Sequence, residues 1–107
     1  MRHKMSHRQV DHTLSLERRA MRMLRRGDAR KAAITLREAT ALDPTGAAFT
    51  RLGHALLLAG KKNDALHALK QALYLFRHDH MRGRARTVAR MILALDPADA
   101  TAQKRAA

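Results

Sequence analysis

Three arginines recur at every fourth position in the C-terminal part of the chain. Arg82, Arg86 and Arg90 would lie along one side of a helix, because residues four apart are neighbours on a helix surface. No acidic residue occurs between them and Asp96, so nothing nearby in the sequence offsets their mutual repulsion. Such a row of guanidinium groups could bind phosphates or other anions, although a merely solvated basic face explains the pattern equally well.

A weaker row of the same kind lies in the N-terminal part of the chain. Arg18, Arg22 and Arg25 follow one another at helical spacing, and Glu17 offers partial compensation. We take the two rows together as a candidate basic face for anions. Phosphate contacts from such a face would give affinity without sequence preference. With one tyrosine, two phenylalanines and no tryptophan, the chain has few rings on which single-stranded bases could stack.

No other constellation in the sequence indicates catalysis or a cofactor. We find no nucleophile–base pair, no glycine-rich phosphate loop and no converging pair of carboxylates, so we expect no enzyme activity and no cofactor. The lack of cysteine excludes disulfides and thiolate metal sites. His78 and His80 flank Asp79, but a zinc site needs about four ligands at defined spacing. We therefore interpret both histidines as linker residues and expect no metal.

The elements that would position these residues are helices. The 107 residues suffice for one domain, and the apolar content comes mainly from alanine, leucine and methionine, which favour helices. Apolar residues recur at spacings of three and four, as on a buried helix face. The pattern predicts an all-α fold of five helices, approximately at 13–26, 29–42, 47–59, 63–76 and 81–95. We expect a mobile basic tail at 1–12, a helical domain at 13–97, and a tail or short helix at 98–107.

The chain also repeats itself with an offset of 33 residues. The matching pairs are Gly27 and Gly60, Ala32 and Ala65, Leu36 and Leu69, Ala39 and Ala72, and Leu42 and Leu75. A fixed period of this length, with small residues at helical spacing, is typical of a stack of helical hairpins.

These residues resemble tetratricopeptide repeats, a family built from helix–turn–helix units of about 34 residues. The first repeat matches at Ala20, Gly27, Ala32, Leu36, Ala39 and the Leu-Asp-Pro of 42–44. The second matches at Phe49, 52–53, Gly60, Ala65, Leu69, Ala72 and Leu75, and 92–97 resembles the close of a third repeat that lacks its first helix. The resemblance implies a right-handed α-solenoid fragment of about two and a half repeats, whose exposed ends could self-associate.

The same resemblance implies a groove for a partner protein. Members of the family are mostly interaction scaffolds, and their concave groove commonly holds a peptide. The groove positions carried over to this chain are Glu17, Met21 and Leu24 on the first helix, and Thr50, His54 and Leu57 on the third. The lysines and asparagines with which some members clamp a C-terminal carboxylate are absent from these positions.

Net charge narrows the class of partner. The chain carries 22 lysines and arginines against 9 aspartates and glutamates, a net charge of +13, which favours anionic partners. We expect a non-enzymatic adaptor that binds an acidic protein or peptide. The alternatives are a nucleic-acid-associated protein that contacts phosphates and a regulatory module that binds a small anion. The sequence contains no run long enough for a membrane span or a signal peptide, so we expect a cytoplasmic protein.

Overall fold

Six α-helices make up most of residues 5–107, the part of the chain that the computed structural model describes. They are α1 (His7–Arg25), α2 (Ala29–Leu42), α3 (Gly46–Leu58), α4 (Lys62–His78), α5 (Arg82–Leu95) and α6 (Ala100–Ala106). The described residues contain no strand, which confirms the predicted all-α class. The prediction of five helices was wrong, because the short segment after Pro97 forms a sixth. Within the described range, no helix is both long and apolar enough to cross a membrane.

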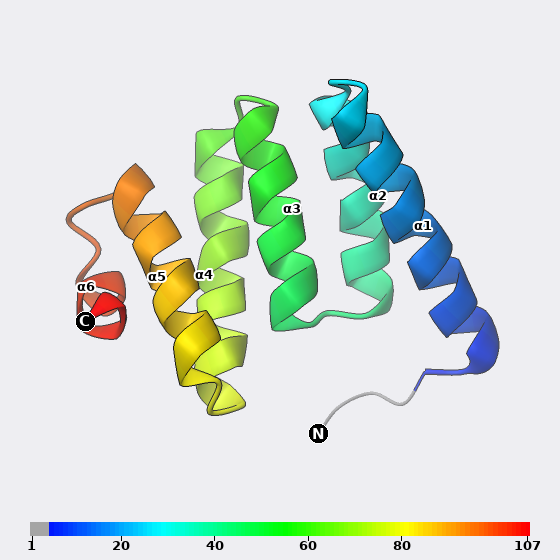
Figure 1. Ribbon diagram of the computed structural model, residues 1–107. Helices are drawn as coiled ribbons and strands as arrows, with labels where there is room; N and C mark the ends of the chain where they lie inside the picture. The colour runs from blue at the N-terminus through cyan, green and yellow to red at the C-terminus, as the bar shows by residue number, and fades with distance from the viewer. Residues whose placement is uncertain (1–4) are drawn as a thin grey trace.

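The helices follow one another across the molecule in chain order, from α1 at one edge to α6 at the other (Figure 1). The main contacts between helices join neighbours in the sequence, and consecutive long helices run antiparallel. The described chain measures 38 × 34 × 18 Å along its principal axes. The shortest dimension accommodates two layers of helices, since one helix with its side chains is about 10 Å across.

Three of the connections are the same tight turn. A residue with positive φ follows the helix in each case: Gly27 at 83°, Gly60 at 77° and His80 at 58°. The next N–H donates to a carbonyl five residues back, at 2.8 Å from Asp28 to Met23, 2.9 Å from Lys61 to Leu56 and 2.8 Å from Met81 to Phe76. This is the hydrogen-bonding pattern of a helix that ends in a left-handed residue. The α4–α5 connection therefore repeats the turns of the α1–α2 and α3–α4 hairpins.

The other two connections are Asp-Pro turns. Asp43 after α2 has φ −142° and ψ 87°, and Asp96 after α5 has φ −141° and ψ 86°. The extended backbone before proline stops each helix. The turn after α5 therefore has the same backbone conformation as the turn after α2. α4 packs against α3 on one side and against α5 on the other.

The predicted inward positions form a core in two clusters. One gathers residues of α1–α4 around Leu36 and Leu56, and the other gathers residues of α4–α6 around Leu69 and Ile92. Phe49 packs against both clusters and so connects them. Small residues bring the helices close together.

The first helix begins earlier than the sequence pattern predicted. It starts at His7 rather than Thr13, because Ser6 and Gln9 form a reciprocal cap. The Gln9 N–H donates to Ser6 Oγ at 3.3 Å, and the Ser6 N–H donates to Gln9 Oε1 at 2.9 Å. The part of the predicted tail from residue 7 to residue 12 is therefore helical, while residues 1–4 lie outside the described range. The additional turns place Val10 on α1, with its side chain exposed.

Candidate partner-binding face and basic pocket

One face of α1 exposes large apolar side chains beside its buried face. Val10, Leu14 and Met21 are 40%, 42% and 44% exposed. Together with Glu17 they recur at spacings of four, three and four, so they lie in line along the helix. We call these four residues the α1 stripe. Leu16 and Ala20, on the neighbouring line, are buried in the core, so the stripe is not needed to cover it.

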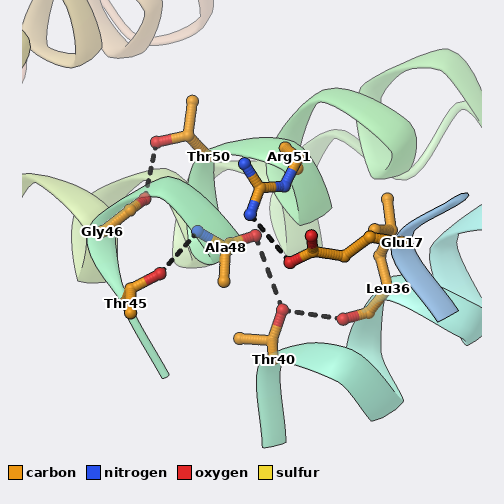
Figure 2. A network of polar contacts seen from close by, with 8 residues as sticks. All are labelled: Glu17, Leu36, Thr40, Thr45, Gly46, Ala48, Thr50 and Arg51. Carbon is orange, nitrogen blue, oxygen red and sulfur yellow. Dashed lines mark hydrogen bonds and ion pairs between the residues drawn. The ribbon is translucent and has the colours of Figure 1, made fainter. Parts of the chain in front are cut away.

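An ion pair joins Glu17 of the α1 stripe to α3. Arg51 Nη2 donates to Glu17 Oε1 at 2.9 Å, and Figure 2 shows the two side chains reaching toward each other from α3 and α1. Glu17 is thus engaged within the protein. Arg51 was not among the predicted groove residues, because nothing in the sequence places it opposite Glu17.

Hydrogen bonds fix α3 against α2 at its start (Figure 2). Thr40 Oγ1 donates to the carbonyl of Leu36 at 2.7 Å and lies 3.4 Å from that of Ala48, which joins the two helices. The Ala48 N–H donates to Thr45 Oγ1 at 3.0 Å, which caps α3. The position of α3 relative to the α1 stripe is therefore set by polar contacts as well as by packing.

The six predicted groove residues take different roles. Met21, His54 and Leu57 are exposed, as a contact surface requires. Leu24 is half-buried against the core. The Thr50 hydroxyl donates to the Gly46 carbonyl at 2.8 Å within its own helix, so this donor is already used. The exposed groove residues are therefore Met21, which belongs to the α1 stripe, and His54 and Leu57 on α3.

The predicted basic face divides into two. All six of its arginines are exposed: Arg18, Arg22, Arg25, Arg82, Arg86 and Arg90. The first three lie on α1 and the last three on α5, which stand apart in the helix order (Figure 1). They therefore do not form one continuous row. Arg18 and Arg25 each follow a residue of the α1 stripe by four positions, so both lie next to that stripe on the helix surface.

Arg82 and Arg86 instead line a pocket of about 650 Å³ between α4, α5 and α6. Arg90 does not line it. Arg77 at the end of α4, and Lys104 and Arg105 on α6, complete its cationic lining. Sequence reasoning missed these three residues, because a short helix that folds back against α5 could not be placed from the pattern.

The placement of α6 depends on Asp99. Its carboxylate accepts the Ala102 N–H at 2.8 Å and lies 3.3 Å from Lys70 Nζ on α4. The backbone hydrogen bond from Ala102, with a further contribution from Lys70, lowers the pKa of the Asp99 carboxyl although partial burial opposes this. The charged form of Asp99 is thus favoured, and it both caps α6 and ties it to α4.

A separate apolar cleft of about 380 Å³ opens between α2 and α4. Leu52 and Leu56 of α3 and Pro44 are among its lining residues. Sequence reasoning had no candidate on this side of the molecule. Within residues 5–107, no group of three or more histidine, aspartate or glutamate side chains could hold a metal ion.

No protein-family model matches the chain, and a comparison with curated proteins finds no similar sequence. The function therefore has to be inferred from the surfaces themselves: the α1 stripe, and the basic pocket at the other end of the helix order.

Proposed function

We propose that this protein is a tetratricopeptide-like adaptor whose α1 stripe, with His54 and Leu57 on α3, binds an acidic amphipathic segment of a partner protein. The observation that carries the proposal is the exposed apolar line on α1, whose Glu17 pairs with Arg51 of α3. A partner helix or peptide that packs along α1 would bury this line.

The repeat-like architecture supports the adaptor proposal. A short right-handed α-solenoid would have helices that contact mainly their sequence neighbours, as this chain does. It would also have recurring turns, such as the three turns with a left-handed residue and the two Asp-Pro turns. Solenoids use extended surfaces to bind partners and do not need an enclosed catalytic cleft. An adaptor without enzyme activity, acting in the cytoplasm, is the corresponding functional proposal.

The positive charge beside the α1 stripe favours an acidic partner segment. Arg18, Arg22 and Arg25 are exposed on α1 next to the stripe, on the side away from the core. An amphipathic segment would place apolar side chains on Leu14 and Met21, and its carboxylates could reach the arginines. The apolar contacts would supply most of the affinity, and the charges would speed association and select the partner.

The test combines capture with direct binding. Wild-type protein is immobilised and exposed to nuclease-treated native extract, and acidic segments of the captured proteins are synthesised as peptides. Their affinities are measured for wild type, for Met21→Glu/Leu57→Glu, and for a control, Ile34→Glu/Tyr74→Glu, which adds the same charge at exposed apolar sites elsewhere. We expect a loss of at least about tenfold, or 1.4 kcal/mol, in the first variant only.

Equal binding by both variants would refute the proposed face. A shift of wild type to a dimer in solution that only Met21→Glu/Leu57→Glu abolishes would identify a second copy of this chain as the occupant, in place of a partner protein. The oligomeric state is read by size-exclusion chromatography with light scattering on the same samples.

The alternative proposal is a nucleic-acid-associated protein. The exposed arginines of α1 and α5 support it, but their separation into two surfaces means that a duplex would have to bridge them. Binding of this kind should fall steeply with salt, because each phosphate contact releases counterions. A peptide held by the α1 stripe should lose less affinity over the same salt range.

A further inference from the structure

The basic pocket concentrates positive charge from three helices. Five cationic side chains line it, namely Arg77, Arg82, Arg86, Lys104 and Arg105. They come from the last turn of α4, the first half of α5 and the last turn of α6. The lining includes no aspartate or glutamate side chain. We call it the α4–α6 pocket.

Two acidic residues lie close to the lining residues in the sequence, Asp79 and Asp99. The Asp99 carboxylate lies 3.3 Å from Lys70 Nζ, which does not line the pocket. The Asp79 carboxylate lies 3.6 Å from Nδ1 of His78, which does. Like charges held together in a concave surface repel one another and create a strong local field for anions.

The chemistry of the lining favours phosphate over other anions. Four of the five cations are arginines, whose guanidinium groups can donate two parallel hydrogen bonds to phosphate oxygens. The pocket volume of about 650 Å³ is far more than one phosphate needs and is typical of sites for small organic ligands. Several phosphates in a chain could engage cations on all three helices at once.

The geometry points to a binding site for a small ligand that carries a chain of phosphates. Two sources share this chemistry, a nucleoside triphosphate and an inorganic polyphosphate. Tyr74 is 61% exposed and lines the same pocket, with its ring centroid 6.2 Å from that of His78. This pair offers a surface on which a nucleobase could stack beside the phosphates.

The inference does not depend on the proposed adaptor function. The α4–α6 pocket lies on the α5–α6 side of the helix order, whereas the α1 stripe is at the opposite edge (Figure 1). Loss of one binding activity can therefore be measured while the other remains.

The test is a calorimetric titration of the full chain with sodium tripolyphosphate and with ATP, at low and at physiological ionic strength. The pocket variant is Arg82→Gln/Lys104→Gln, and the matched control is Arg18→Gln/Arg22→Gln on α1. Both pairs remove two exposed positive charges and leave the core intact. We expect the pocket variant to lose at least about tenfold in affinity for tripolyphosphate, and the control to lose less than about twofold.

Equal losses in the two variants would overturn the inference, because they would show a general charge effect without a site. Absence of tripolyphosphate and ATP binding to wild type would overturn it as well. As a second measurement, amide NMR shifts of wild type should move on titration at 77–86 and 104–105 and stay unchanged at 18–25. Shifts spread over both basic surfaces, with tighter binding of a duplex oligonucleotide, would assign the arginines to nucleic acid and refute the pocket.

The two sources are distinguished by Tyr74→Leu. If ATP binds more tightly than tripolyphosphate and this substitution removes the difference, the ligand is a nucleotide. If tripolyphosphate binds at least as tightly and the substitution has no effect, the ligand is an inorganic chain. Either result supports a phosphate-chain site.

Discussion

Arg51 on α3 and Glu17 on α1 form an ion pair at 2.9 Å across 34 positions of sequence. The pair joins two helices that are not consecutive, whereas the main helix contacts are between sequence neighbours. Its side chains are 42% and 23% exposed, so solvent screens it only in part. It brings Glu17 of the α1 stripe into contact with α3.

A double-mutant cycle on this pair should give a small but measurable coupling. We expect Glu17→Ala and Arg51→Ala together to destabilise the protein by less than the sum of the single changes. The difference should be about 0.5–1 kcal/mol, as for partly exposed ion pairs. Urea unfolding of the four proteins measures it. Strict additivity would show that the two side chains do not stabilise each other.

His80→Gly should stabilise the fold. His80 has φ 58°, in the region that Gly27 and Gly60 occupy in the two equivalent turns. A residue with a side chain costs about 1–2 kcal/mol of folding free energy in this conformation, and glycine avoids that cost. Glycine also loses more conformational entropy on folding, which offsets part of the gain. We therefore expect a net gain of up to about 1 kcal/mol in urea unfolding. Gly27→Ala is the reciprocal control: its Cβ would meet nothing within 4 Å, so any loss of stability reports the backbone alone.

Gly53→Ala should destabilise the α3–α4 contact. A Cβ at this position would lie 2.9 Å from both Cγ and Cδ2 of Leu69, and 3.4 Å from the Ala65 carbonyl oxygen. Overpacking of this kind costs about 1–3 kcal/mol, which exceeds the roughly 1 kcal/mol that alanine contributes to a helix. Thermal unfolding monitored by circular dichroism measures the net effect.

The matched control for that change is Gly83→Ala. Gly83 is exposed on α5, and a Cβ there would meet nothing within 4 Å. The same substitution should therefore raise stability slightly through helix propensity, by less than the roughly 1 kcal/mol of a helix interior, because Gly83 is in the first turn of α5. If both alanines shifted the melting temperature in the same direction, close packing at Gly53 would not be the cause.

Acid should loosen α6 through Asp99. The folded-state pKa of this carboxyl is lowered from 3.8, first by the Ala102 N–H and then by Lys70. Its stabilising contribution is therefore fully present above the unfolded value and is lost as pH falls through the lower, folded value. Asp99→Ala should remove about 1 kcal/mol at neutral pH, as for other N-cap residues, and should abolish this part of the acid dependence.

The measurement is hydrogen exchange of the α6 amides as a function of pH. Because α6 carries Lys104 and Arg105 into the α4–α6 pocket, Asp99→Ala should also weaken tripolyphosphate binding without touching the ligand. Unchanged exchange in the variant would mean that the packing of Ala102 alone holds the helix.

Several features followed from local sequence physics. Spacings of three and four placed Leu16, Leu36, Leu69 and Ile92 on buried faces, and all four are buried. Asp-Pro at 43–44 and 96–97 stops helices wherever it occurs, because proline restricts the residue before it. The early start of α1 also has a local cause, the reciprocal cap of Ser6 and Gln9, which the prediction of a tail at 1–12 did not include.

Other features depend on contacts between residues distant in the chain. The sequence predicted a linker at His80 but not its left-handed conformation, which a residue other than glycine adopts only when its surroundings favour it. The Glu17–Arg51 pair needs α3 to be docked on α2 first. The α4–α6 pocket needs α6 to fold back and bring Lys104 and Arg105 beside Arg82. Helical periodicity determines which face of each helix is buried. How the exposed charges of separate helices come together is set by helix packing, because that packing alone fixes their distances.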